Sequence, residues 1–390
     1  MFFVDKPYVS DFFKMTVRDN AIPVVDTDIT KELDLYSGTK IVSEDKAIKM
    51  TRESDNPAIY TTSENSIGWI SKNLAFSNLP GKIELFKNKL KFRELTKSIF
   101  PNFYFKSVGV EDLKQIQFSE LPVPFIIKPA VGFMSMGVYK VSNFEEWTNT
   151  IDSIIAEIDQ IKDLYPAEVL DTSLFIIEQC INGDEFAVDV YYNSIGEPVI
   201  LNILNHTFSS DTDVSDRVYI SSKKIIESNL EEFTGFAEKI GNLARVKNFP
   251  VHIELRRDND GTLLPIEVNP MRFGGWCTTP DIAFLAYGFN PYLYYYSQKK
   301  PNWSEVLKGK EGKLFCVIVL NNSTGVDADE ITSFNYEKLL SKFEKPIELR
   351  KIDFQKYPVF GFLFTETRED NFIELKNILN SDLNEFISTK

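Results

Sequence analysis

The sequence predicts an α/β fold of the α+β kind, with an N-terminal α/β domain, two α+β lobes and a small C-terminal extension. Short strands alternate with helices near the N-terminus, the middle of the chain is rich in strands, and the last part follows a β-α-β-β-α order. With 390 residues, of which 43% are hydrophobic and 26% charged, the chain is long enough for two or three domains with their own cores. The expected domains cover residues 1–85, 86–172, 173–300 and 313–390.

Elements of the first half follow from short apolar runs and from residues that start or stop helices. Thr62 or Ser63 can cap the first of these helices, and Pro101 stops the second. The expected order is strands at 22–25 and 58–60, a helix at 69–74, a turn and domain boundary at 78–81, a helix at 86–99, strands at 103–106, 125–128 and 137–141, and a helix at 144–164.

The second half begins with strands and ends with a mixed segment that forms either a separate lobe or part of the preceding one. A polar stretch, 206–224, fits either a loop that closes over a substrate or an ordinary solvated loop. The expected order is strands at 174–178, 185–192 and 198–204, a helix at 230–246, a hairpin at 252–270, a helical stretch to 296, strands at 314–320, 347–352 and 359–366, and helices at 336–343 and 371–387.

The hairpin at 252–270 carries the most specific signal in the chain. Asp260-Gly261 is typical of a two-residue type I′ turn. This turn would pair Glu254 with Glu267 and His252 with Asn269, and the period of two would place all four on one face. Two opposed carboxylates, with Cβ atoms roughly 5 Å apart, repel each other. The pattern therefore predicts a bound cation, and oxygen ligands of this kind suit Mg²⁺.

Charge and cysteine content exclude several classes of protein. A net charge of −14 argues against nucleic acid or an anionic membrane as the main partner. Three widely spaced cysteines fit a reducing compartment better than a disulfide framework. The N-terminus does not resemble a signal peptide, and the longest apolar run, 314–320, is too short to span a membrane. We expect a cytoplasmic protein with small-molecule partners, for which a homodimer remains open.

Four further segments, at 86–95, 125–141, 175–186 and 269–276, accompany the hairpin. Lys128 ends an apolar strand before a loop of small residues, from where it can reach phosphates. In this order and spacing, the five segments resemble the ATP-grasp superfamily, of the type that ligates carboxylates to amines or thiols. The resemblance extends from about residue 87 to 282, after a preceding α/β domain, and it implies that the two lobes clamp ATP.

The resemblance implies roles for individual residues. Lys89 and Lys128 would bind the ATP phosphates, with Lys91 as the alternative to Lys89, and the loop with Ser135 would cover the triphosphate. Residues that would hold the adenine are Glu178, Gln179, Cys180 and Ile181, and Glu185 would bind the ribose.

For the chemical step, the resemblance implies that Glu254, Glu267 and Asn269 hold Mg²⁺ (or Mn²⁺) on ATP. Arg272 would contact the transferred phosphate, and the amides of Gly274 and Gly275 would stabilise an oxyanion. His252 either contacts a phosphate or hydrogen-bonds Asn269. Trp276 either lines the acceptor pocket or packs in the core.

The implied activity is an ATP-dependent ligase that converts a carboxylate to an acyl phosphate and couples it to an amine or a thiol. A phosphotransferase and a nucleotide-binding regulatory protein without turnover are the alternatives. No glycine fingerprint of a dinucleotide-binding dehydrogenase occurs in residues 1–40.

Overall fold

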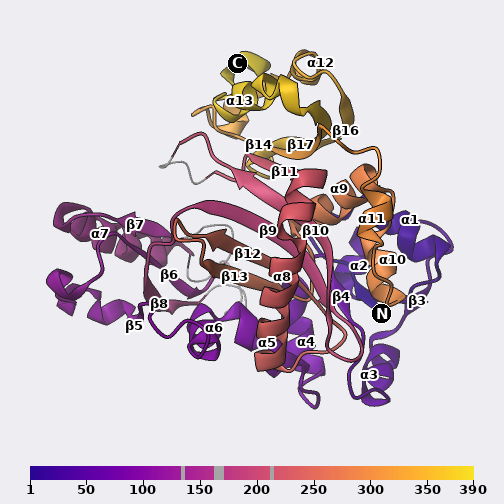
Figure 1. Ribbon diagram of the computed structural model, residues 1–390, viewed down its shortest axis with the longest axis horizontal. Coiled ribbons are helices and arrows are strands. Elements are labelled where there is room, and N and C mark those ends of the chain that lie inside the picture. The colour runs from indigo at the N-terminus through magenta and orange to yellow at the C-terminus, as the bar shows by residue number, and fades with distance from the viewer. Residues whose placement is uncertain (133–136, 162–170, 211–214) are drawn as a thin grey trace.

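The computed structural model describes residues 1–132, 137–161, 171–210 and 215–390. A long central sheet runs through the molecule, a separate lobe lies at one end of it, and the N-terminal domain packs beside it (Figure 1). Within these ranges, no helix is long and apolar enough to cross a membrane.

The N-terminal domain is a parallel sheet of very short strands in the order β3-β2-β1-β4. Parallel strands need crossover connections, and here helices supply them. Its elements are β1 (Phe2–Phe3), α1 (Asp11–Asp19), β2 (Val24–Val25), α2 (Asp28–Glu32), β3 (Ile41–Val42), α3 (Glu44–Arg52), β4 (Tyr60–Thr61), a 3₁₀ helix (Glu64–Ser66) and α4 (Ile67–Asn73).

Two helices lead from this domain into the lobe. The sequence predicts a turn at 78–81 and one helix over 86–99; instead α5 covers Leu79–Lys87 and α6 covers Lys89–Thr96. Pro80 lies in the first turn of α5, where its missing N–H costs nothing. Asn88 breaks the two helices apart and caps the second, because its side chain accepts a hydrogen bond from Lys91 N.

The lobe contains a four-stranded sheet in the order β5-β8-β6-β7. Its elements are β5 (Phe105–Gly109), β6 (Phe125–Val131), β7 (Tyr139–Val141), α7 (Phe144–Ile161) and β8 (Asp171–Gln179). The predicted boundary at 172/173 is wrong, because it falls inside β8, which pairs with both β5 and β6. The chain leaves the lobe after Gln179.

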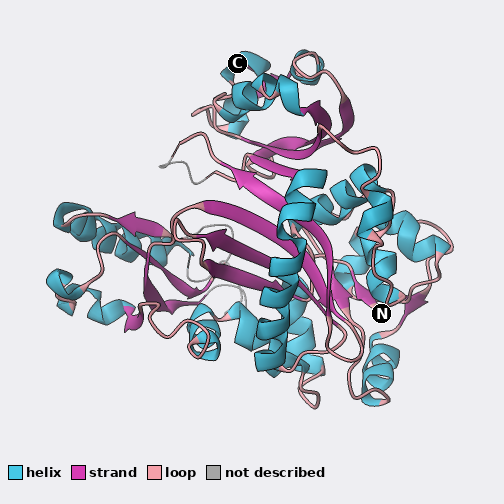
Figure 2. Cartoon of the chain, in the orientation of Figure 1, coloured by secondary structure: helices cyan, strands magenta, loops and turns pink. Residues whose placement is uncertain are grey.

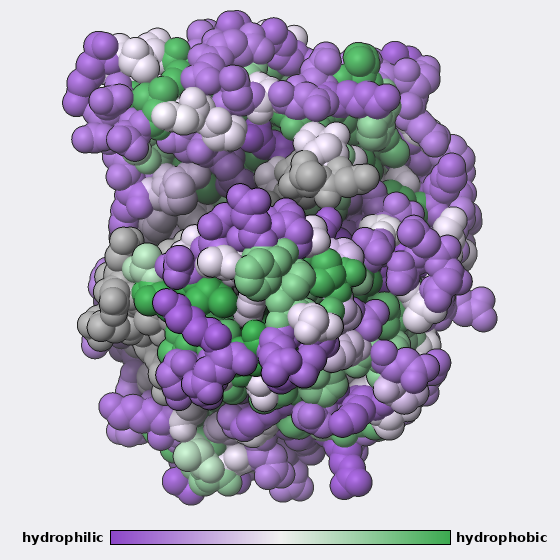
Figure 3. Space-filling model, turned by 90° about the vertical axis from the view of Figure 1, so that its left-hand side faces the viewer, coloured by the Kyte–Doolittle hydropathy of each residue, from purple (hydrophilic) through white to green (hydrophobic). Residues whose placement is uncertain are grey.

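One face of the lobe carries a group of apolar residues. In Figure 3, which turns the lobe toward the viewer, hydrophobic residues gather within a largely hydrophilic surface. Exposed large apolar residues of the lobe are Val123, Val138, Phe144 and Ile155.

The central sheet has eight strands in the order β13-β12-β9-β10-β11-β14-β17-β16. Helix α8 lies across one face (Figure 2). Its Gly241 meets the ring of Tyr192, where a Cβ would lie 2.2 Å from Cε1, so only glycine allows this close approach. Elements in this part are β9 (Asp184–Tyr192), β10 (Pro198–Thr207), β11 (Val218–Ser222), α8 (Lys223–Ala244), β12 (Phe249–Arg257), β13 (Leu263–Pro270), α9 (Thr278–Tyr287), α10 (Pro291–Tyr296) and α11 (Trp303–Val306).

The C-terminal part belongs to this same sheet through β14, β17 and β16, which answers the question of a separate lobe. Strand β11 lies in the polar stretch 206–224, which was expected to be a loop, and joins the two parts of the central sheet by pairing with β10 and β14. The remaining elements are β14 (Lys313–Asn321), β15 (Ile331–Phe334), α12 (Tyr336–Leu340), β16 (Pro346–Lys351), β17 (Val359–Arg368), α13 (Ile373–Leu379) and β18 (Ile387–Thr389).

The hairpin of β12 and β13 has the predicted pairing but not the predicted turn. Asp258 N donates to Thr262 O at 2.9 Å, so the loop has three residues with Gly261 left-handed (φ +88°). This longer loop shifts the register by one residue. A bulge after Glu254 shifts it back, so Glu254 does lie opposite Glu267 and His252 opposite Asn269.

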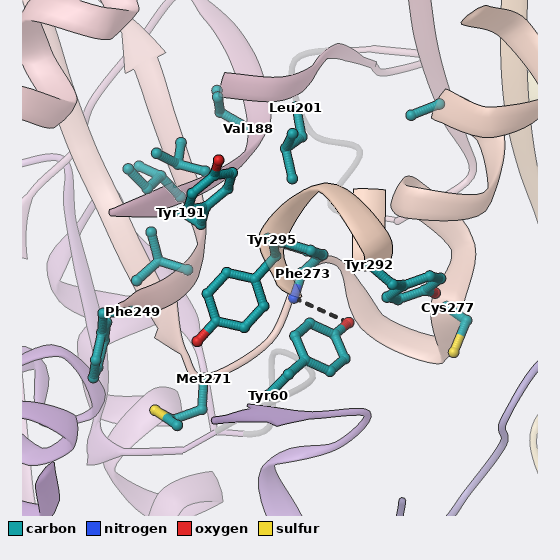
Figure 4. Close-up of a cluster of buried hydrophobic side chains, with 14 of the residues drawn as sticks. Tyr60, Val188, Tyr191, Leu201, Phe249, Met271, Phe273, Cys277, Tyr292 and Tyr295 are labelled. Atoms are coloured by element: carbon teal, nitrogen blue, oxygen red, sulfur yellow. Dashed lines mark hydrogen bonds between the residues drawn. The ribbon is translucent and has the colours of Figure 1, made fainter. Parts of the chain in front are cut away.

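Aromatic side chains join the N-terminal domain to the central sheet (Figure 4). The ring of Tyr60, on β4, lies 5.2 Å from Phe273 and 5.5 Å from Tyr292. Thr61 N donates to Met271 O at 2.8 Å, directly after β13. The N-terminal domain is therefore fixed against the segment that follows the hairpin.

Candidate functional site

The hairpin face holds two acidic side chains in a common hydrogen-bond arrangement. The Asn269 amide donates to Glu254 Oε1 at 3.3 Å and to Glu267 Oε1 at 3.1 Å. Burial, the facing carboxylate of Glu267 and nearby acids raise the pKa of Glu254 well above its usual value. Burial would also raise the pKa of Glu267, but Lys89, Lys128 and Lys87 lower it far below the usual range.

The pKa values of these two facing acids are shifted in opposite directions. The lysines beside Glu267 favour its ionised form, whereas burial and the neighbouring acids disfavour ionisation of Glu254. A divalent cation would offset the repulsion between them, and with Asn269 turned to present its oxygen the set would offer three oxygen ligands. Among the described residues, no group of three or more His, Cys, Asp or Glu side chains is placed to hold a metal ion. The residues therefore fit an ion that takes the rest of its ligands from a bound phosphate and water.

Lys89 faces this hairpin from the start of α6. Its Nζ lies 3.0 Å from Glu267 Oε2 and 3.4 Å from Gly132 O, and the side chain is buried. Lys91 is exposed and pairs with Glu84 on the neighbouring helix. Of the two register alternatives, the structure brings only Lys89 into the site.

Lys128 and Glu178 form a buried ion pair in the lobe sheet, and Arg93 completes it. Arg93 Nε donates to Glu178 Oε2 at 2.6 Å, and its Nη1 donates to Pro265 O, on the hairpin, at 2.6 Å. Burial opposes ionisation of Glu178, but Arg93 and Lys128 lower its pKa to about 2. Sequence reasoning missed Arg93, although it lies one helical turn after Lys89, on the same face.

A second missed group is Glu64, a buried acid of the N-terminal domain. Arg272 Nη2 donates to Glu64 Oε1 at 2.6 Å, and Lys87 pairs with the other oxygen. Lys87 Nζ also donates to Gly132 O at 3.0 Å. Burial opposes ionisation of Glu64, but the two cations lower its pKa to about 2. Arg272 is thus held at the site by a residue from a different domain.

In the segment between the lobe and the central sheet, two backbone amides donate hydrogen bonds to other parts of the lobe. Gln179 N donates to Tyr104 O at 3.2 Å, and Cys180 N donates to Pro124 O at 3.4 Å. These two amides are therefore not available to an adenine, which Gln179 and Cys180 were expected to hold. Among the described residues, none accepts a backbone hydrogen bond from Ile181 N. Ile181 N and Cys180 O remain the backbone groups suited to a planar ligand.

Glu185 lies at the start of β9 with both oxygens engaged. His206 Nδ1 lies 2.7 Å from Oε1, and Arg256 Nε donates to Oε2 at 2.8 Å. His206 stacks on Tyr219 with ring centroids 4.2 Å apart. Burial opposes ionisation of Glu185, but His206 and Arg256 lower its pKa. An ionised carboxylate in this position can accept from hydroxyl groups, as expected for ribose.

The turn after β13 corrects one prediction. Gly274 N donates to Asp189 Oδ1 at 3.0 Å and to Thr279 Oγ1 at 2.8 Å, so this amide is not available to an oxyanion. A Cβ at Gly274 would lie 2.1 Å from Thr279 Oγ1, which explains the glycine by packing. Gly275 has open space around its Cα, and its role at an oxyanion stays a prediction.

His252 contacts Asp189, whereas the sequence suggested either a phosphate or Asn269 as its partner. Its Nδ1 lies 2.7 Å from Asp189 Oδ1, and its Nε2 lies 3.9 Å from Glu254 Oε1. Trp276 is half-buried against Tyr357 and Phe362, so packing accounts for much of its surface. Ser135, and with it the centre of the expected phosphate-covering loop, lies outside the described residues.

Comparisons with known proteins identify a domain family for the middle of the chain. Residues 121–280 match the family model of the ATP-grasp domain. No match among curated proteins was found. Residues 121–280 therefore match an ATP-grasp domain, and this range includes β6, β7 and β8 of the lobe and the hairpin of β12 and β13.

Solved structures match over the whole chain. An L-amino acid ligase from Bacillus licheniformis has 19% identity and a TM-score of 0.69, covering 100% of this chain and 98% of its own. An N5-carboxyaminoimidazole ribonucleotide synthetase from Thermotoga maritima has 15% identity and a TM-score of 0.64, with 99% and 98% covered. A biotin carboxylase from Campylobacter jejuni, in complex with β-γ-ATP, has 12% identity and a TM-score of 0.63, with 100% and 92% covered. At these identities the similarity establishes the ATP-grasp fold.

Proposed function

We propose, on the premise of an ATP-grasp fold, that the protein is an ATP-dependent ligase that joins a substrate carboxylate to an amine, or to a thiol. ATP would bind between the lobe and the hairpin, and ADP and phosphate would be released. The observation that carries the proposal is the meeting of Lys89 and Lys128, from the lobe side, with the opposed acids Glu254 and Glu267 of the hairpin.

This arrangement suits a triphosphate. Lys89 and Lys128 are buried lysines that form ion pairs with the carboxylates of Glu267 and Glu178. We propose that phosphate oxygens replace part of those contacts, with Glu254, Glu267 and Asn269 holding Mg²⁺ (or Mn²⁺). The ion, when bound, would neutralise charge on the transferring phosphate. Ile181 and Glu185 are proposed to contact the adenine and the ribose.

The chemical steps need no nucleophilic side chain. A carboxylate oxygen of the substrate attacks the γ-phosphorus, the bond to ADP breaks, and an acyl phosphate forms. The acceptor nitrogen or sulfur then attacks the acyl carbon, phosphate leaves with the bonding electrons, and the acceptor loses a proton. Arg272, held by Glu64, would bind the phosphate in both steps, and Gly275 N–H would serve the oxyanion.

The test is an ADP-release screen of carboxylate and amine pairs with ATP and Mg²⁺, using native protein and Glu267→Gln. We expect release that depends on a carboxylate and a stoichiometric amide product. Hydroxylamine, offered in place of the amine, should give a hydroxamate. Failure of ATP to bind, or normal turnover by Glu267→Gln, would overturn the proposal. ADP and a phosphorylated product without an amide would indicate a phosphotransferase.

A cytoplasmic location is proposed with this activity. The three cysteines are free, with Cys277 and Cys316 buried and Cys180 half-buried, as suits a reducing compartment.

A further inference from the structure

A row of polar side chains crosses the central sheet beneath the proposed site. Asn202 on β10, Asp189 on β9, His252 on β12 and Asn269 on β13 are direct cross-strand partners, one strand after another. All four are at most 6% exposed, within strands whose other residues are mostly apolar. Buried polar groups of this kind are stable only when they satisfy one another.

Asp189 is the centre of this row. It is fully buried and accepts three hydrogen bonds, from His252 Nδ1 at 2.7 Å, Gly274 N at 3.0 Å and Thr279 Oγ1 at 2.6 Å. Asn202 supports the arrangement by donating to Thr279 O at 3.0 Å. The position of the Asp189 carboxylate is therefore fixed from two sides, by the neighbouring strand and by the turn after β13.

This fixed carboxylate determines how the His252 ring is oriented. A carboxylate only accepts at these distances, so Nδ1 of His252 carries the hydrogen that points to Asp189. The opposite nitrogen, Nε2, then faces Glu254 Oε1 at 3.9 Å, on the floor where we place the metal and the phosphates. Other charged groups on this side are Glu267 and, paired with it, Lys89.

We propose that Asp189 is a positioning residue that acts through His252, by holding the ring with Nε2 turned to the transferring phosphate. The proposal rests on the proposed function. His252 would contact a phosphate oxygen through Nε2, and Asp189, which touches no substrate, would fix the ring and its tautomer. Residues that bind the nucleotide elsewhere, such as Lys128 and Ile181, do not depend on Asp189.

The chain has only two histidines, which makes the ring directly observable. Nitrogen-15 spectra of the histidine side chains, recorded at a fixed alkaline pH, report which nitrogen carries the hydrogen. Variants His206→Gln and His252→Gln assign the two sets of signals. We expect His252 in the Nδ1–H tautomer in native protein. The Nε2–H tautomer in native protein would overturn the proposal without any variant.

Asp189→Leu removes every acceptor at similar size and should release His252 from the Nδ1–H tautomer. We expect it to lower kcat by on the order of 10–100-fold, as for residues that orient a ligand, with little change in KM for ATP. In a His252→Leu background the same substitution should add almost nothing. Equal effects in the two backgrounds, or an unchanged tautomer, would overturn the role.

The matched control is Asp281→Asn. Asp281 is also a buried carboxylate, bound to Tyr292 and Arg350, but it lies on α9 and does not contact His252. We expect this variant to lose stability while the His252 tautomer stays as in native protein. A changed tautomer here would show that any loss of a buried carboxylate disturbs the ring. If no substrate pair gives turnover, the proposed ligase activity fails, whereas the tautomer spectra still decide the role of Asp189.

Discussion

Lys89, at the start of α6, and Glu267, on the hairpin strand β13, form an ion pair with 3.0 Å between Nζ and Oε2. One was predicted to bind a phosphate and the other a metal. Each neutralises the charge of the other, and a bound nucleotide with its cation would give Lys89 a phosphate and Glu267 a metal ion as partners.

Glu267→Gln tests the metal role. The amide is a weaker ligand and leaves Lys89 without its anion, so Mg²⁺ affinity should fall by at least about 10–100-fold. Titration of ADP release with Mg²⁺ measures this. Glu254→Gln should show a similar fall, and a variant with native Mg²⁺ dependence would remove that residue from the set.

Lys89→Met and Lys91→Met form a matched pair on one helix. Lys89 is buried at the site, whereas Lys91 is exposed on Glu84. We expect Lys89→Met to reduce kcat/KM for ATP by on the order of 10²-fold and Lys91→Met to leave it unchanged. The opposite result, a loss only in Lys91→Met, would assign the phosphate-binding role to Lys91.

Glu178 should make stability depend on pH in the acid range. Its pKa falls from 4.5 to about 2 in the folded chain, because burial is outweighed by Arg93 and Lys128. A carboxyl group with a lowered folded-state pKa stabilises the fold above the unfolded value and loses that contribution as pH drops toward 2. The shift corresponds to about 3 kcal/mol.

Urea unfolding of native protein and Glu178→Gln at several pH values measures this contribution. The difference in unfolding free energy should be largest near neutral pH and should shrink below about 4.5. Glu94→Gln, at an exposed residue paired with Lys97, is the control. A difference that stays constant with pH would contradict the assignment of the charge to Glu178.

Gly274→Ala and Gly275→Ala separate packing from chemistry in the turn after β13. A Cβ at Gly274 would lie 2.1 Å from Thr279 Oγ1, and we expect a loss of roughly 1–3 kcal/mol or more. Gly275 has open space and keeps its amide as alanine, so stability and kcat should both persist. Thermal unfolding and ADP release report the two effects. A Gly274→Ala protein as stable as native would contradict the packing explanation.

For the hairpin, the local sequence pattern predicted which residues pair but not the geometry of the turn. Glu254 and Glu267 were expected to face each other because of a two-residue turn. A three-residue loop and a bulge reach the same pairing by another route. Burial of one face fixes which side chains are opposed, whereas the turn can vary as long as the same residues stay opposite each other.

Other residues could not be placed from sequence because their role depends on distant partners. Arg93 and Glu64 act through contacts with Glu178 and Arg272, and nothing local marks those pairs. Strand β11 was missed because Ser221 and Ser222 look solvated, although both are buried. Asp189 did leave a signal, since it is the one acid in the otherwise apolar stretch 186–192 of β9.

The position of β14 in the central sheet has a consequence for folding during translation. Strand β11 is made well before its neighbour β14, because helix α8, the hairpin and three further helices lie between them in the chain. Until the C-terminal part leaves the ribosome, β11 presents an unpaired edge that can pair with other nascent chains. The central sheet can therefore be completed only after β14 has been translated.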